Sequence, residues 1–171
     1  MPRAAPNSLH NSRALYSMLA DAARTLQAAH RHCEQQGLRL TPGRSRLLQA
    51  LAQAGEPSTA YDLLEQLQAS QAERIHPQTV YRALDFLCEA GLIHRIASTG
   101  QFILCEHVQC SHQHRPSQFL VCSQCGNVAE MELEKEYLDS FAEQMQRCGF
   151  RPNTNGIEIH GLCANCCNPL Q

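Results

Sequence analysis

Two pairs of cysteines are the residues of this sequence best suited to metal chemistry. The first pair is Cys122 and Cys125, and the second pair is Cys163 and Cys166. Two thiolates separated by two residues can bind one ion from a tight turn, and two such pairs supply the four sulfur ligands that suit tetrahedral Zn²⁺. Because such a site has no open coordination position, we expect it to be structural rather than catalytic.

Each pair follows a stretch that we predict to be a strand running into a turn. Two similar turns joined by one ion are favoured over two unrelated redox or core cysteine pairs. Cys167 is an alternative to Cys166, but two intervening residues is the commoner spacing between thiolate ligands. Cys33, Cys88 and Cys148 lie on apolar faces or at ends of predicted helices, where we expect them to fill the core.

A second group of metal-ligand residue types lies near the middle of the chain. Its members are His94, Cys105, His107, Cys110, His112, His114 and Glu130. Imidazole, thiolate and carboxylate ligands together suit Zn²⁺. Several histidines in one loop are also compatible with an ordinary solvated surface, so the residue types alone leave both interpretations open.

The composition restricts the class of protein. A chain of 171 residues can bury one good core or two small ones, and its ten cysteines fall below the density of a disulfide-built secreted scaffold. The first residues lack the apolar run of a signal peptide, and no segment approaches the length that spans a bilayer. We therefore expect a cytoplasmic protein whose thiols stay reduced and available for metal.

The formal net charge of −2 is unevenly distributed along the chain. Residues 1–104 carry ten arginines against eight acidic residues, whereas residues 105–171 carry four basic against eight acidic residues. Within residues 1–53, seven arginines face two acidic residues. A mildly basic first half joined to an acidic second half suggests a different partner for each half.

The first half has the pattern of a winged helix-turn-helix. Four helices are predicted: one ending before Gly37, one beginning at Thr41-Pro42, one capped by Thr59, and one from His76 to Gly91. Apolar residues recur every three or four positions at Leu19, Ala22, Leu26, Ala29, Cys33, Leu47, Leu48, Leu51, Leu63, Leu64 and Leu67. Residues 92–105 are predicted to form a hairpin around a Ser-Thr-Gly turn. In this fold, the helix before the hairpin enters the major groove of DNA.

The fourth predicted helix has two distinct faces. Its apolar residues are Val80, Ala83, Leu84 and Leu87. Arg82 lies almost opposite them and is well suited to a bidentate contact with guanine. The candidate DNA-contacting residues are Gln78, Thr79, Tyr81 and Arg82, with Arg44 and Arg46 near the start of the second helix. An ordinary solvated helix face is the alternative interpretation.

The second half is predicted to be a small α/β unit. Leu133, Tyr137, Phe141 and Met145 define an apolar helix face that ends at Gly149, between the two cysteine-bearing strands. A strand-helix-strand unit of this size buries little by itself. A second copy of the chain would cover its sheet edge and apolar helix face, so we expect a homodimer.

Six segments of the chain resemble, in order, the ferric uptake regulator family. They are Leu-Thr-Pro at 40–42, Tyr-Asp-Leu-Leu at 61–64, Thr-Val-Tyr-Arg-Ala-Leu-Asp-Phe-Leu at 79–87, Gly-Leu-Ile-His at 91–94, Cys-x-x-Cys-Gly at 122–126 and Ile-Glu-Ile-His-Gly-Leu-Cys at 157–163. The resemblance extends over residues 18–167 and is strongest to the zinc-responsive branch of the family.

The resemblance implies an α+β fold with two domains. It places a winged-helix DNA-binding domain at residues 17–104 and an α/β dimerisation domain with a structural zinc site at residues 116–171. Residues 105–115 would form a hinge and metal-binding loop. Residues 1–16 would be a flexible extension.

The resemblance also implies the ligands of an exchangeable, sensory zinc: His94, Cys105, His114 and Glu130. One thiolate and one carboxylate balance the charge of Zn²⁺, and two neutral imidazoles complete a tetrahedron. The soft sulfur ligand disfavours iron, because the relatives that sense iron or peroxide use nitrogen and oxygen ligands.

The loop that carries His114 departs from the family pattern. The segment from His114 to Cys122 is one residue longer than in the familiar arrangement, so His112 is an alternative ligand and Cys110 could also substitute. His107 and His160 would suit a third, weaker site, which some relatives have.

The function implied by the resemblance is that of a transcriptional repressor. With zinc bound, it would recognise palindromic operators of zinc-uptake genes as a homodimer, using one structural and one regulatory zinc per protomer. No enzymatic activity, membrane partner or small-molecule substrate is implied. The alternatives are a family member that senses iron or peroxide and a zinc-stapled protein-interaction module. A zinc hydrolase or deaminase is disfavoured because its motifs are absent and a full ligand set leaves no metal-bound water.

Overall fold

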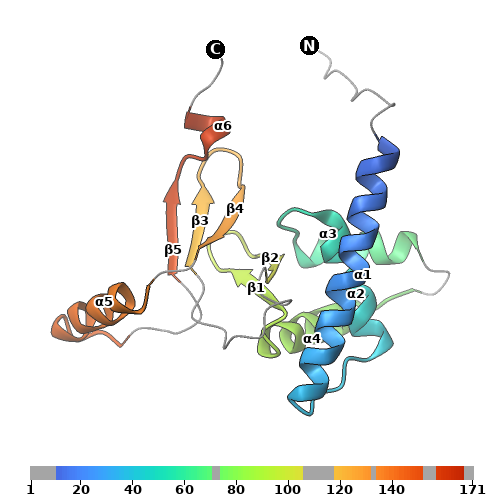
Figure 1. Cartoon of the computed structure of the whole chain (residues 1–171), viewed down its shortest axis with the longest axis horizontal. Coiled ribbons are helices and arrows are strands. Elements are labelled where there is room, and N and C mark those ends of the chain that lie inside the picture. Colours follow the sequence, from blue (N-terminus) through green and yellow to red (C-terminus); the bar gives the residue numbers. More distant parts are fainter. Residues whose placement is uncertain (1–10, 71–73, 106–117, 132–133, 152–156, 168–171) are drawn as a thin grey trace.

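The computed structural model describes residues 11–70, 74–105, 118–131, 134–151 and 157–167. Its elements are α1 (Asn11–Gln35), α2 (Pro42–Ala54), α3 (Ala60–Ala69), α4 (Pro77–Glu89), β1 (Ile93–Ile96), β2 (Gln101–Leu104), β3 (Gln118–Cys122), β4 (Val128–Met131), α5 (Lys135–Arg147), β5 (Ile157–Gly161) and α6 (Ala164–Cys167). Figure 1 shows the four long N-terminal helices on one side, the β3–β5 sheet on the other, and the β1–β2 hairpin between them. The predicted α+β class is confirmed.

The helices begin and end at the local signals that the sequence carries. A capping box opens α3: the Thr59 hydroxyl accepts a hydrogen bond from the Asp62 N–H, and the Asp62 carboxylate accepts one from the Thr59 N–H. Thr41 precedes α2 as predicted, but among the described residues its side chain caps no backbone N–H, and Pro42 supplies the start. After α4, Gly91 adopts a φ of 67°, which turns the chain into β1. The helix α1 begins at Asn11, inside the predicted extension at residues 1–16.

The main core lies among the first four helices and the hairpin. The helix α2 packs against α1, α3 and α4, and α4 packs against β1. The largest fully buried side chains of this core are Leu47, Leu48, Leu63, Leu84, Leu87, Leu92 and Ile93. Full burial of each such side chain contributes about 1.5–3 kcal/mol. This core therefore holds α4 in a fixed orientation relative to the hairpin.

Strand β2 of the hairpin pairs on both of its sides. Strands β1 and β2 are antiparallel, with His94 opposite Ile103. On its other edge, β2 forms a bridge to Ser58, whose N–H donates to the Phe102 carbonyl at 3.0 Å while the Phe102 N–H donates back at 2.8 Å. These bonds anchor the hairpin to the segment between α2 and α3, as in a winged helix-turn-helix.

The second half contains a three-stranded sheet of order β4-β3-β5. Strands β3 and β4 are antiparallel, whereas β3 and β5 are parallel and are connected through α5. The predicted strand-helix-strand unit is present, but β4 was not predicted, because its four residues follow the Cys125 turn too closely to show an alternating pattern. A small second core formed by Ile96, Phe119 and Val121 joins the hairpin to this sheet.

The helix α5 presents an apolar face to solvent in this single chain. Tyr137 is 65% and Phe141 45% exposed, and Figure 1 shows α5 lying apart from the helical bundle. The helix begins at Lys135, so Leu133, which was predicted to belong to it, lies outside the described residues. The prediction that Cys148 fills the core is wrong: Cys148 caps the end of α5 and is exposed, since α5 has no core of its own to fill. Cys33 is buried as predicted, and Cys88 is half-buried against the core.

Candidate metal centres and nucleic-acid interface

The two cysteine pairs meet at one end of the sheet. The ligand atoms of Cys122, Cys125, Cys163 and Cys166 all lie within 4.8 Å of one another, and the sulfurs of Cys125 and Cys163 are 3.6 Å apart. Four sulfurs bound tetrahedrally to Zn²⁺ at its usual bond length are about 3.8 Å apart. The donor set and its spacing therefore fit a four-thiolate zinc ion without rearrangement of the backbone.

Backbone hydrogen bonds bring the two pairs together. Cys122 ends β3, and the turn after it is closed by the Gly126 N–H, which donates to the Cys122 carbonyl at 2.9 Å. The Ser123 N–H donates to the Gly161 carbonyl of β5 at 2.8 Å, which aligns the ends of the two parallel strands. Each pair follows a strand that runs into a turn, as predicted, but the first turn leads to β4 and the second is one helical turn, α6.

The protonation states of these thiols differ because their surroundings differ. Backbone N–H groups of Cys125, Cys163 and Gln124 lower the pKa of Cys122 to about 6. A hydrogen bond with Cys163, together with burial, raises the pKa of Cys166 to about 12. Since metal binding requires the thiolate, binding at this cluster must release protons.

The structure separates the two neighbouring candidates for the fourth thiolate. The Cys166 sulfur lies in the cluster, whereas the Cys167 sulfur donates a hydrogen bond to the Leu162 carbonyl at 3.4 Å. This placement follows from the helical turn of α6, in which adjacent side chains point about 100° apart.

A second cluster bridges the hairpin and the sheet. His94 of β1, Cys105 just after β2 and Glu130 of β4 place their ligand atoms within 4.8 Å of one another. His94 Nε2 lies 3.3 Å from Glu130 Oε1. Nitrogen, sulfur and oxygen from three separate strands or strand ends converge here, so three of the four predicted sensory residues are brought together.

This mixed cluster is shielded from water. The Glu130 side chain is 1% exposed and Cys105 is 2% exposed. A carboxylate and a thiolate buried side by side are costly unless a positive charge joins them, which a divalent cation would supply. Phe119 packs its ring against the His94 imidazole, with the ring centroids 5.2 Å apart, and so restricts the orientation of His94. The donor set therefore fits Zn²⁺ well.

Most of the remaining candidate ligands lie in a segment outside the described residues. His107, Cys110, His112 and His114 lie outside the described residues. His160 is described, but it lies on β5 beside Glu158 rather than in either cluster. The choice between His114 and His112 as a fourth ligand, and the third site, thus stay predictions.

The predicted DNA-contacting face of α4 is on the surface. Gln78, Thr79, Tyr81 and Arg82 are exposed, while Val80, Leu84 and Leu87 of the same helix are buried. A hollow of about 320 Å³ lies between the starts of α2 and α4, and its lining includes Arg44, Arg46, Thr79 and Arg82. This arrangement concentrates positive charge where the N-terminal ends of two helices meet.

Arg44 is more constrained than its neighbour. Its guanidinium stacks on the Phe86 ring, 3.4 Å from the ring centroid, and donates to the Arg39 carbonyl at 2.7 Å. Arg46 is exposed and donates to the Pro42 carbonyl at 3.4 Å. Arg44 therefore helps to pack α2 against α4 as well as lining the hollow.

Two residues between the hairpin and the β4-β3-β5 sheet were not singled out from the sequence. They are Phe119 and Glu158. Phe119 orients His94, and Glu158 of β5 binds the turn of the hairpin. Both lie in short strands where they look like ordinary core and surface residues. The alternation Ile-Glu-Ile-His at 157–160 is a signal for Glu158, since it places an acidic residue and a histidine on one face of a strand.

These elements define a winged helix joined to a small α/β unit, with one metal-ligand cluster at one end of the sheet and one between the hairpin and the sheet. The family model described as the ferric uptake regulator family matches residues 35–160. The chain belongs to this family, and the resemblance noted in its sequence is confirmed.

Individual relatives are similar over most of their length. The "Zinc uptake regulation protein" of Escherichia coli (strain K12) is 38% identical over 143 residues, which cover 82% of this chain and 80% of that protein. A solved structure, "Zinc Uptake Regulator Complexed With Zinc AND DNA", has a TM-score of 0.72 and 34% identity, covering 84% of this chain and 93% of that chain.

Two solved structures of another relative match this chain to different degrees. The structure described as holo XcZur is 38% identical with a TM-score of 0.68, covering 83% of this chain and 96% of that chain. The structure described as apo XcZur is 37% identical with a TM-score of 0.51, covering 87% and 99%. The present fold is therefore more similar to the holo form. Among the residues that the structure describes, none of the helices combines the length and apolar character needed to cross a membrane.

Proposed function

We propose that this chain is a zinc-responsive repressor that binds palindromic operators of zinc-uptake genes when its second metal site is loaded. The observation that carries this proposal is the cluster of His94, Cys105 and Glu130, whose ligands come from both the hairpin and the sheet. A metal ion there connects the winged-helix DNA-binding domain to the sheet of the second half. The relatives named for zinc uptake regulation, one of them bound to zinc and DNA, support the same function.

Two zinc ions per protomer have different roles. The four cysteines at the end of the sheet form a closed structural site. The mixed cluster, completed by a histidine from the segment between β2 and β3, is the exchangeable site. Its thiolate selects zinc over iron, which argues against a sensor of iron or peroxide. No catalytic role follows, because a complete ligand set leaves no position for a metal-bound water.

The DNA contact is made by α4 and the hollow beside it. Arg82 is the residue best placed for a bidentate guanine contact, and Gln78 and Thr79 reach base edges or phosphates at the start of the helix. Arg46 and Arg44 contact the phosphate backbone, which fixes the register of the protein on DNA. The DNA-binding domain corresponds to residues 17–104.

A homodimer presents two copies of α4 to a palindromic site. The exposed apolar face of α5 and the exposed sheet residues Leu120 and Ile159 are surfaces that a second copy covers. Dimerisation through residues 116–171 leaves both copies of α4 free to bind half-sites one helical turn apart, or a multiple of that distance. A repressor that holds metal on reduced thiols works in the cytoplasm.

The proposal is tested by measuring metal content and DNA binding together. The purified chain should carry two zinc ions per protomer, one of which a mild chelator removes. A DNA duplex selected by the zinc-loaded chain from a randomised library should be bound about 100-fold more tightly with the exchangeable zinc than without it. A chain stripped of that ion that binds the duplex equally well contradicts the proposal, and a chain that selects no duplex points to a protein-interaction module.

A further inference from the structure

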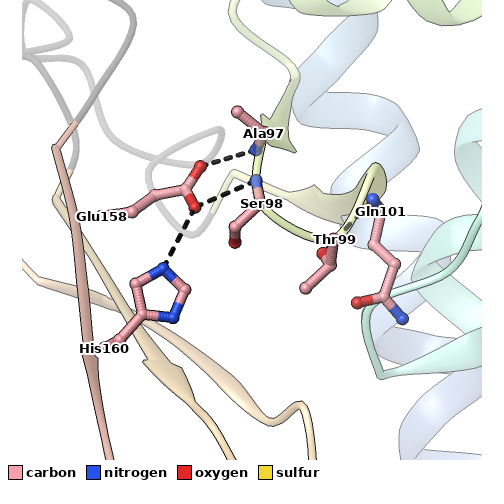
Figure 2. A network of polar contacts seen from close by, with 6 residues as sticks. All are labelled: Ala97, Ser98, Thr99, Gln101, Glu158 and His160. Atoms are coloured by element: carbon pink, nitrogen blue, oxygen red, sulfur yellow. Dashed lines mark hydrogen bonds and ion pairs between the residues drawn. The ribbon is translucent and has the colours of Figure 1, made fainter.

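A single carboxylate from the last strand holds the turn of the hairpin. Glu158 Oε1 accepts a hydrogen bond from the Ala97 N–H at 2.6 Å, and Glu158 Oε2 accepts one from the Ser98 N–H at 3.2 Å. Figure 2 shows the carboxylate reaching from β5 to the hairpin turn, with His160 beneath it. We call this contact, made by Glu158 with the N–H groups of Ala97 and Ser98, the wing clasp.

The wing clasp and the mixed metal cluster lie in one row of the sheet. Phe119 of β3 pairs with Glu130 of β4 on one side and with Glu158 of β5 on the other. Residues paired in this way project from the same face of a sheet. One face therefore carries a metal-ligand carboxylate, a buried ring and the clasp carboxylate side by side.

All three residues of this row act on the same strand of the hairpin. Glu130 lies 3.3 Å from the imidazole of His94 in β1, and Phe119 packs against His94 and belongs to one buried cluster with Ile96. Glu158 binds the two residues that follow Ile96. Strand β1 is thus attached to the sheet near its start by the metal cluster and just beyond its end by the clasp.

The clasp is strong for its position because it pairs backbone N–H donors with an ionised acceptor. Hydrogen bonds to charged groups are shorter and stronger than those between neutral groups. The Glu158 side chain is only 17% exposed, so water competes weakly for it. His160 Nε2 lies 3.9 Å from Glu158 Oε2 and adds favourable charge when it is protonated.

We propose that Glu158 is a positioning residue for DNA binding, because it fixes the hairpin turn to the sheet. Metal binding at His94 then orients the whole DNA-binding domain rather than only one end of β1. This inference rests on the proposed function. A strand attached at one point can rotate about that point, whereas a strand attached at both ends cannot. The metal cluster adds an attachment near the start of β1, the packing of Ile96 on Phe119 supports the strand, and the clasp fixes the turn beyond its end without any metal.

The expected consequence is a loss of DNA affinity without a loss of zinc. Glu158→Ala removes both acceptors, and Glu158→Gln keeps one carbonyl oxygen but loses the charge, so its effect should be intermediate. The matched control is Glu143→Gln, which removes the same charge from an exposed site on α5, where Glu143 pairs only weakly with Arg147 at 3.9 Å. None of the three variants removes a predicted metal ligand or a residue of the α4 surface.

The experiment uses the full chain with both zinc ions bound and has two independent readouts. The first is amide hydrogen exchange at Ala97 and Ser98, which should become about tenfold faster in Glu158→Ala. The second is the affinity for the selected DNA duplex, which should fall about tenfold in the zinc-loaded Glu158→Ala variant. Zinc content should match that of the wild type in all variants, and every variant should remain folded at the temperature of the assay, so that the lower affinity of Glu158→Ala reflects positioning rather than lost metal or unfolding.

The outcomes separate this inference from the proposed function. Unchanged exchange at Ala97 and Ser98 in Glu158→Ala overturns the wing clasp, whatever the DNA result. Faster exchange with undiminished DNA affinity overturns the positioning role, as does an equal loss in Glu143→Gln. A wild-type chain whose DNA binding ignores zinc overturns the proposed function and the positioning role with it, but leaves the exchange result to decide whether the clasp exists.

Discussion

The two metal-ligand clusters differ in what they connect. The four-cysteine cluster joins the ends of β3 and β5, which are already neighbours in one sheet and share backbone hydrogen bonds. The mixed cluster joins β1 and the end of β2 to β4, which belong to different parts of the molecule. Metal at the first site can change the stability of one unit, whereas metal at the second site can change how two units are held together.

Depth of burial does not separate the two sites. Cys122 is buried and Cys125 exposed in the four-cysteine cluster, whereas Cys105 is buried and His94 half-buried in the mixed cluster. A structural site is often assumed to be the buried one. Here the elements that a site links are a better guide to its role than its depth.

The largest effect is expected from breaking the first cluster. Cys163→Ser removes one of four sulfurs and should abolish tight zinc binding there, because structural zinc supplies about 10–16 kcal/mol in small zinc domains. Zinc content should fall by one ion per protomer and thermal unfolding, followed by circular dichroism, should begin at a clearly lower temperature. Cys167→Ser is the matched control, since its sulfur bonds the Leu162 carbonyl instead. Equal zinc loss in both variants would contradict the assignment of Cys166.

Breaking the second cluster should leave the fold intact and remove the response. Cys105→Ser should lower zinc affinity at the mixed site by about 100-fold or more while the four-cysteine site stays loaded. Competition with a chromophoric zinc chelator measures this affinity, and DNA binding should lose its dependence on zinc. Cys88→Ser, at a half-buried cysteine of α4 outside both clusters, is the control. A metal response that survives Cys105→Ser would favour a sensor of iron or peroxide.

A smaller effect tests whether the winged-helix domain, which the mixed cluster connects to the sheet, binds DNA through α4. Arg82→Ala should cost about 1–3 kcal/mol of binding free energy and relax the preference at one base position. Fluorescence anisotropy with single-base variants of the selected duplex measures both quantities. Arg147→Ala removes an exposed arginine from α5 and should leave binding unchanged. Equal weakening for every base variant would make Arg82 a phosphate contact instead.

The smallest effect concerns the ionisation of Glu158 at the junction. Burial opposes its charge, but hydrogen bonds from the Ser98 hydroxyl and from the N–H groups of Ala97 and Ser98 hold its pKa below the ordinary value. The stabilisation is therefore complete above the pKa of an unperturbed carboxyl and is lost as the pH falls through the lower pKa of the folded state. The Ala97 amide proton shift, followed by NMR, should stay constant until the pH falls below the range in which an unperturbed glutamate carboxyl titrates. A change of that shift within the ordinary range would show that the clasp carries no extra stabilisation.

Features that depend on neighbours in sequence were predictable. The capping box at Thr59, the Gly91 turn and the buried stripe of α4 all follow from residues within one or two helical turns. The spacing within each cysteine pair was recognisable for the same reason, whereas the joining of the two pairs was inferred from the four ligands that tetrahedral Zn²⁺ takes. Local prediction failed at Thr41, whose side chain caps no N–H group among the described residues, and at Cys148, which is exposed. A residue type at the right position need not make the expected contact.

What the sequence determined by itself is the set of local elements and the residue types of two metal-ligand groups, since periodicity, capping and ligand spacing act over a few residues. Only the tertiary structure decided that Glu158 reaches a turn 60 residues earlier. It also brought together the ligand groups that the sequence had named, with Cys166, which the spacing had favoured, in the first cluster and Cys167 outside it. The physical reason is that strand register and the packing of the hairpin on Phe119 are set by contacts between distant segments. A row of residues across a sheet exists only after its strands have paired.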